Sequence, residues 1–161
     1  MASTYSFAKL IAPFDKAEFL SSYWEKKPCV IKRARPDYYS DLLSLRAFDR
    51  VITTVSAMHP QCFIANAARE VPAEEYTNQN AQVDPTRLYQ QYADGGTIVY
   101  SQLETVYNPL ADFCRSLERE MSNHFQCNIY CTPPSAQGFP THYDNHDVFV
   151  LQIHGTKKWY L

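Results

Sequence analysis

The sequence predicts an α+β fold, with a helical lead-in over residues 1–94 and the first strands of a sheet over residues 95–161. Two observations carry this prediction. Apolar residues recur at helical spacing in four stretches, three of them before residue 94, whereas short β-branched and aromatic runs gather after it. The chain has 161 residues. That length suits a single domain that buries roughly 68–70% of its unfolded surface.

The first predicted helix runs from Asp15 to Trp24. Asp15 is a suitable N-cap, Glu18 is its capping-box partner three residues later, and Pro28 ends the segment. A short strand is predicted over residues 29–31. It lies in a basic stretch that contains Lys26, Lys27, Lys32, Arg33 and Arg35. We interpret these charges as a solvated strand edge in preference to an RNA or ribosome contact, which remains the alternative.

Three more helices follow along the chain. One lies within residues 40–55, and either Ser40 or Ser44 is its start. After a polar stretch at 70–82, interpreted as a surface loop, Asp84 and Pro85 open the next helix, which the glycine pair at 95–96 ends. The last helix begins at Asn108-Pro109, and its core face is predicted to hold Leu110, Phe113, Leu117 and Met121.

The predicted strands are short and lie mostly near the C-terminus. They cover residues 97–100, 126–132 and 147–153. Residues 133–140 form an irregular loop in which Gly138 lets the backbone turn, and residues 154–156 form a hairpin turn. Because the strand-like tail has no turn or polar terminus after it, we expect this sheet to be truncated, as in an N-terminal portion of a longer protein.

Composition excludes several classes of protein. Gly95, Gly96, Gly138 and Gly155 are the only glycines, and they cannot form a dinucleotide fingerprint or a phosphate loop. The formal net charge is −2, so direct nucleic-acid binding is not expected. No apolar run is long enough for a membrane span, and we expect a cytoplasmic protein. Five cysteines without a C-x-x-C pair favour reduced thiols.

The candidate metal ligands are His142 and Asp144, which form an H-x-D pair. In an extended segment, residues two apart point to the same face, so an imidazole and a carboxylate can bind one ion. Chance alone gives roughly 0.5 H-x-D or H-x-E pairs in a chain of this composition. The H-x-D spacing alone is therefore weak evidence for a metal site, and the assignment depends on the surrounding sequence.

The surrounding sequence resembles a known family. From Asn128 to Asp144 it follows the pattern N-x-Y-x-T-P-x-x-x-Q-G-x-x-x-H-Y-D, and D-V-F-x-L-Q and G-x-K-x-W follow. These motifs resemble the cupin-like JmjC oxygenases of the ribosomal-oxygenase type. The segment from Phe19 to Pro28 also resembles the opening helix and strand of that family, so the resemblance covers most of the chain.

The resemblance implies a double-stranded β-helix, or jelly roll, that holds Fe(II) and uses 2-oxoglutarate and O₂ to hydroxylate a protein side chain. His142 and Asp144 match the first two metal ligands, and Lys157 matches the cation that pairs with the distal carboxylate of 2-oxoglutarate. Tyr130 and Asn128 are further candidates for binding the co-substrate, because alternate residues of a barrel strand point inward. Core packing and strand hydrogen bonding explain these last two equally well.

One feature departs from the family pattern. The second histidine ligand of the family lies well downstream of the H-x-D pair, and neither His146 nor His154 is placed to replace it. We therefore expect the 161-residue chain alone to be inactive and its parent to be an oxygenase acting on a protein, with a ribosomal-protein arginine or histidine as the target. A homodimer through a region outside this chain is a further expectation.

Two alternatives remain. The first is a non-catalytic cupin-like binding module with an incomplete metal site. The second is a cupin isomerase or another metal-dependent enzyme. The G-x-K-x-W stretch, which resembles the oxygenase family, argues against this second alternative.

Overall fold

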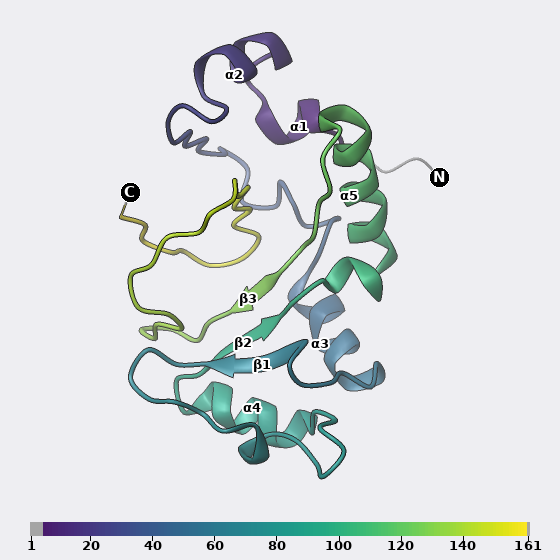
Figure 1. The fold of residues 1–161 in the computed structure, drawn as a ribbon, viewed down its shortest axis with the longest axis vertical. Coiled ribbons are helices and arrows are strands. Elements are labelled where there is room, and N and C mark those ends of the chain that lie inside the picture. The colour runs from purple at the N-terminus through teal and green to yellow at the C-terminus, as the bar shows by residue number, and fades with distance from the viewer. Residues whose placement is uncertain (1–4, 161) are drawn as a thin grey trace.

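The structure is a computed structural model, and it describes residues 5–160. Short helices and one small sheet follow each other along the chain (Figure 1). The helices are α1 (Phe7–Ile11), α2 (Lys16–Ser22), α3 (Leu45–Thr54), α4 (Pro85–Ala93) and α5 (Asn108–Met121), with 3₁₀ turns η1 (Ala73–Glu75) and η2 (Leu103–Thr105). The strands are β1 (Cys62–Ala65), β2 (Thr97–Tyr100) and β3 (Ile129–Cys131).

The three strands form an antiparallel sheet in the order β1-β2-β3. In this register Ala65 pairs with Thr97, and Ile98 pairs with Cys131. All four residues of β2 are buried, since β2 is the central strand and α4 packs against it and β1. The predicted boundary at residue 94 falls between β1 and β2, so the two stretches contribute strands to one sheet.

The helix starts follow the capping chemistry of the sequence. The Asp15 carboxylate accepts a hydrogen bond from the Glu18 backbone N–H at 2.8 Å, and Asp84 caps α4 in the same way. The Ser44 hydroxyl accepts from the Ala47 N–H at 3.1 Å, so the start of α3 is Ser44 and not Ser40. The predicted capping residues of these three helices are therefore confirmed.

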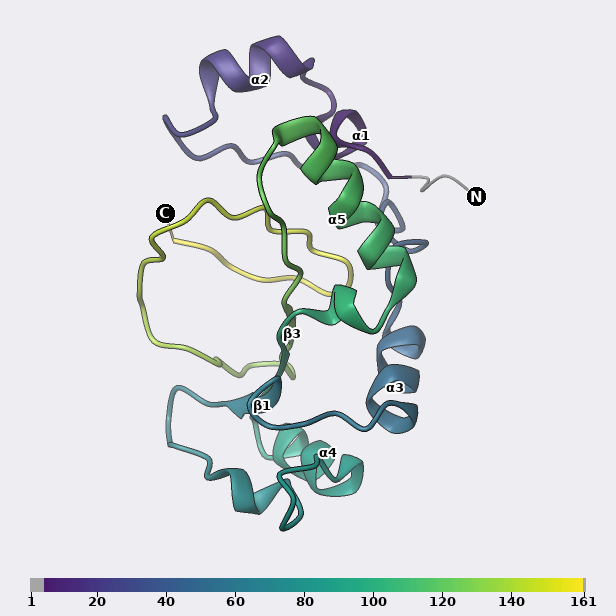
Figure 2. The same cartoon turned by 45° about the vertical axis from the view of Figure 1, so that its right-hand side comes forward.

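The core is built from the apolar faces that the helical spacing predicts. Along α5, Leu110, Phe113 and Leu117 are buried, while Met121 is half-buried against them. The α1–α2 pair lies at one end of the molecule and α4 at the other, in both views (Figures 1 and 2). At the end of α4, Gly95 has a φ of +94°, the left-handed conformation that glycine adopts without strain.

Several local predictions differ from the structure. Residues 29–31 and 147–153 are extended but are not strands, because no backbone–backbone hydrogen bond within residues 5–160 joins either segment to a neighbour. Of the predicted strand 126–132, only the residues of β3 pair with a neighbouring strand. The polar stretch 70–82 is not purely a surface loop, because the Tyr76 side chain within it is 1% exposed. Strand β1 was not predicted.

The architecture of the described residues is thus a helical lead-in with a small three-stranded antiparallel sheet. Closure of the sheet into a jelly roll stays a prediction. Among residues 5–160, every helix is too short or too polar to cross a lipid bilayer.

Candidate metal centre

His142 lies in the loop that follows β3, with its imidazole exposed. Its Nδ1 atom is 2.8 Å from the Pro140 carbonyl oxygen. A carbonyl can only accept a hydrogen bond, so Nδ1 donates this bond and Nε2 is the ring nitrogen that remains for a metal. Metal-binding histidines have this arrangement, with one ring N–H donated to a carbonyl and the other nitrogen directed to the ion.

Asp144 is exposed two residues after His142. None of the ion pairs found within residues 5–160 involves its carboxylate, so both oxygens are available to a cation. Over the same residues, no group of three or more histidine, cysteine, aspartate or glutamate side chains is placed to hold a metal. His142 and Asp144 therefore offer two donor types that metal centres use, and residues 5–160 form no complete ligand group with them.

Aromatic contacts connect His142 with two other predicted site residues. The His142 ring lies 5.8 Å from the Phe139 ring, and Phe139 meets Tyr130 of β3 edge-on at 5.9 Å. The Lys157 ammonium lies 6.0 Å from the centroid of the Tyr130 ring and 4.7 Å from that of Trp159. These contacts gather His142, Tyr130 and Lys157 on one side of β3.

Asn128 is placed differently. Its side-chain oxygen accepts a hydrogen bond from the Gln102 backbone N–H at 3.0 Å. Gln102 has a φ of 56°, so this bond supports a left-handed residue just before η2. The Asn128 side chain thus has a structural partner between β2 and β3.

The segment after the H-x-D pair is held by an aromatic cluster centred on Phe149. Its ring stacks on Trp24 and Phe19, with centroids 5.6 and 6.1 Å away, and it also contacts Phe7 and Phe125. Phe7 lies in α1 and Phe19 in α2, while Trp24 follows α2 and Phe125 follows α5. The lead-in therefore contacts the predicted site segment through side chains and not through a shared strand.

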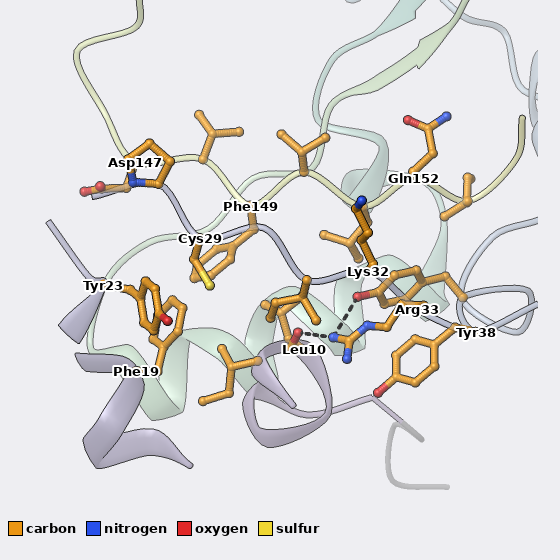
Figure 3. Close-up of a pocket in the computed structure, with 18 of the residues that line it drawn as sticks. Leu10, Phe19, Tyr23, Cys29, Lys32, Arg33, Tyr38, Asp147, Phe149 and Gln152 are labelled. Carbon is orange, nitrogen blue, oxygen red and sulfur yellow. Dashed lines mark hydrogen bonds between the residues drawn. The ribbon is translucent and has the colours of Figure 1, made fainter. Parts of the chain in front are cut away.

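A groove of about 1190 Å³ lies beside this cluster (Figure 3). Residues 10–39 form one wall and residues 147–156 form the other, so the H-x-D pair lies outside it. Arg33 in the first wall donates hydrogen bonds to the Leu10 and Ala12 carbonyls at the end of α1 and stacks on Tyr38 at 4.3 Å. This cation of the basic stretch thus supports a helix end.

Residues 102–161 match the family described as the JmjC domain. This segment is similar to JmjC domains. The chain is 32% identical over 156 residues to the bifunctional lysine-specific demethylase and histidyl-hydroxylase NO66 of Drosophila grimshawi, and 33% identical over 155 residues to that of Aedes aegypti.

These alignments cover 94% and 96% of this chain but only 21% and 24% of the two relatives. The chain thus spans about a fifth to a quarter of their length. All five predicted site residues fall inside the JmjC segment, namely Asn128, Tyr130, His142, Asp144 and Lys157.

Sequence reasoning missed two features of the JmjC segment. It assigned no role to Phe139, the ring that connects His142 with Tyr130, or to Phe149, the centre of the aromatic cluster. The only local signal at either position is an aromatic side chain in a segment next to the H-x-D pair. That signal does not say which distant rings it meets.

Proposed function

We propose that the chain carries part of the catalytic centre of an Fe(II)- and 2-oxoglutarate-dependent oxygenase that hydroxylates a protein side chain. His142 and Asp144 are two of its metal ligands. The observation that carries the proposal is the bond from His142 Nδ1–H to the Pro140 carbonyl, which leaves Nε2 for a metal, with a carboxylate two residues further along the chain. The relatives named as a demethylase and hydroxylase support the same reaction class.

The donor set fits the proposed metal. Non-haem Fe(II) oxygenases use two imidazoles and one carboxylate on one side of the ion and leave the other positions open. His142 and Asp144 supply one of each, and the second imidazole must come from a residue that residues 5–160 do not bring to the pair. When bound, iron would supply the O₂ chemistry, while the protein positions the reactants.

Lys157 is the proposed partner of the distal carboxylate of 2-oxoglutarate. Within the described residues its ammonium has no carboxylate partner and lies against the Tyr130 and Trp159 rings. A cation beside aromatic surface suits a dicarboxylate, because the ring faces exclude water from one side of the ion pair. Tyr130 would then form part of the co-substrate pocket.

The proposed substrate is a side chain of another protein, such as a ribosomal protein. His142 and Asp144 are exposed, so a macromolecule can approach the pair directly. With only two ligands in the described residues, we expect the chain to bind a divalent metal weakly and to show little turnover alone. Metal binding is therefore the first property to test.

Titration with Mn(II), followed through the EPR signal of the free ion, tests the proposal. We expect one weak site that His142→Ala or Asp144→Ala abolishes, while the control His146→Ala leaves it intact. Adding 2-oxoglutarate should strengthen Mn(II) binding, and Lys157→Ala should remove that gain. Mn(II) binding that survives both ligand substitutions would refute the assignment, and a chain that binds no Mn(II) would favour the non-catalytic binding module.

A further inference from the structure

The loop that carries His142 rests on one end of the three-stranded sheet. Just after β1, the Ala67 N–H donates a hydrogen bond to the Gln137 carbonyl at 2.9 Å. The first residue of β2, Thr97, faces Gly138, and Tyr130 of β3 contacts Phe139. Three consecutive loop residues therefore contact the segment just after β1, the first residue of β2 and the middle residue of β3.

Gly138 lies so close to Thr97 that no side chain fits at this position. A Cβ atom at this position would lie 2.7 Å from Thr97 Oγ1 and 2.9 Å from Thr97 Cβ, closer than real Cβ atoms approach other atoms. The backbone bends at Gly138, as the sequence predicts. Gly155 and Gly95 are the glycines with a positive φ in the described part of the chain, so this bend needs no left-handed residue, and close approach to Thr97 is the further reason for glycine here.

Thr97 cannot easily make room for a larger residue. Its side chain is 1% exposed, and its Oγ1 shares a hydrogen bond with Thr132 Oγ1 at 3.0 Å. Rotating Thr97 would break that bond inside the sheet and leave a buried hydroxyl without a partner. An added methyl group at residue 138 is therefore accommodated by displacing the loop.

We propose that Gly138 is a positioning residue for the His142–Asp144 pair, because its missing side chain lets the loop lie directly on Thr97. The inference rests on the proposed metal-binding function. The displacement passes from Gly138 to the next residue, Phe139, whose ring contacts both Tyr130 and His142. A single aromatic side chain, that of Phe139, therefore connects the contact at Gly138 with the ring of His142.

The size of the effect follows from the contact distances. Restoring ordinary van der Waals separation at Thr97 requires a shift of roughly 0.5–1 Å. Changes to groups that orient a metal ligand cost roughly 10–100-fold in metal affinity, so we expect Gly138→Ala to weaken Mn(II) binding by about tenfold.

The test is NMR spectroscopy of the full 161-residue chain and its Gly138→Ala variant. One readout is the set of nuclear Overhauser effects between the Tyr130, Phe139 and His142 rings. The other is the Mn(II) concentration that half-broadens the His142 and Asp144 amide signals. Two controls separate positioning from folding.

The first control, Thr141→Ala, alters an exposed residue next to His142. The second, Ser44→Ala, removes the N-cap of α3 and so lowers stability at a site away from the loop.

We expect Gly138→Ala to lose the ring-to-ring effects and to need about tenfold more Mn(II), while both controls keep the wild-type midpoint. If Gly138→Ala keeps both readouts, the positioning role is wrong. If Ser44→Ala weakens Mn(II) binding equally, the effect comes from general destabilisation and the proposal also fails. If the wild-type chain shows no broadening at residues 142 and 144, the metal assignment fails, and loss or retention of the ring-to-ring effects still decides whether Gly138 seats the loop.

Discussion

The rings of Trp24 and Phe149 stack with their centroids 5.6 Å apart and their planes 17° from parallel. Trp24 follows α2 in the lead-in, and Phe149 follows the H-x-D pair in the JmjC segment. The loop with His142 and Asp144 is therefore fixed at both ends, by Gly138 on the sheet and by Phe149 on the lead-in.

Phe149 is expected to be the main anchor of residues 147–153. Phe149→Ala should lower the free energy of unfolding by about 2–3 kcal/mol, because it removes a half-buried ring from four aromatic contacts. Urea unfolding measures the change. The neighbouring control Val150→Ala, whose side chain is 56% exposed, should have little effect. Equal losses for both variants would contradict the anchoring role.

The start of α3 gives a second prediction. Ser44→Ala should cost about 1 kcal/mol, since it removes the hydroxyl that accepts the Ala47 N–H. Ser40→Ala should leave stability unchanged because Ser40 lies before the helix. Thermal unfolding of the two variants makes the comparison, and a larger loss for Ser40→Ala would place the helix start upstream.

Arg33 is predicted to act through the C-terminal end of α1. Arg33→Gln should destabilise the fold by about 2 kcal/mol, because charge-assisted hydrogen bonds to the Leu10 and Ala12 carbonyls are lost. The matched variant Arg35→Gln should show no measurable change, since that exposed cation pairs only with Asp37. Chemical denaturation of both proteins decides the matter. Identical stabilities would mean that Arg33 is only part of a solvated charged surface.

Stability should fall at alkaline pH. Burial raises the pKa of the Cys62, Cys114 and Cys127 thiols to about 12. Above pH 9 the unfolded chain loses these protons while the folded chain keeps them, so the free energy of unfolding decreases from about pH 9 to pH 12. Each thiol contributes a slope of at most about 1.4 kcal/mol per pH unit.

Urea unfolding at pH 8.0, 9.5 and 10.5 measures this slope. Cys62→Ala should flatten it, whatever the absolute stability of the variant. A slope that does not change in this variant would show that Cys62 titrates normally in the folded protein.

Local chemistry accounts for what could be predicted from the sequence. Asp15 and Asp84 cap helices as expected, because an N-cap acts on backbone groups two or three residues away. The apolar stripe of α5 is likewise confirmed, since helical periodicity already identifies the buried face.

The features that were missed depend on distant partners. Residues 147–153 have the composition of a strand, but no neighbour within residues 5–160 pairs with their backbone. Conversely, β1 is only four residues long and becomes a strand by pairing with β2. At the site, the H-x-D spacing identified His142 and Asp144 as candidates. The contacts of Gly138 with Thr97 and of Phe149 with Trp24 have no sequence signal, because their partners lie far away along the chain.

The most direct test of the account is succinate formation from 2-oxoglutarate by the natural-length protein that carries this chain, assayed with Fe(II) and O₂. We predict Fe(II)-dependent succinate that His142→Ala abolishes and His146→Ala retains. Succinate formation that persists in the His142→Ala protein would contradict the assignment of His142 as a metal ligand. If the natural-length protein forms no succinate even with its protein substrate present, the proposal that it is an oxygenase is wrong.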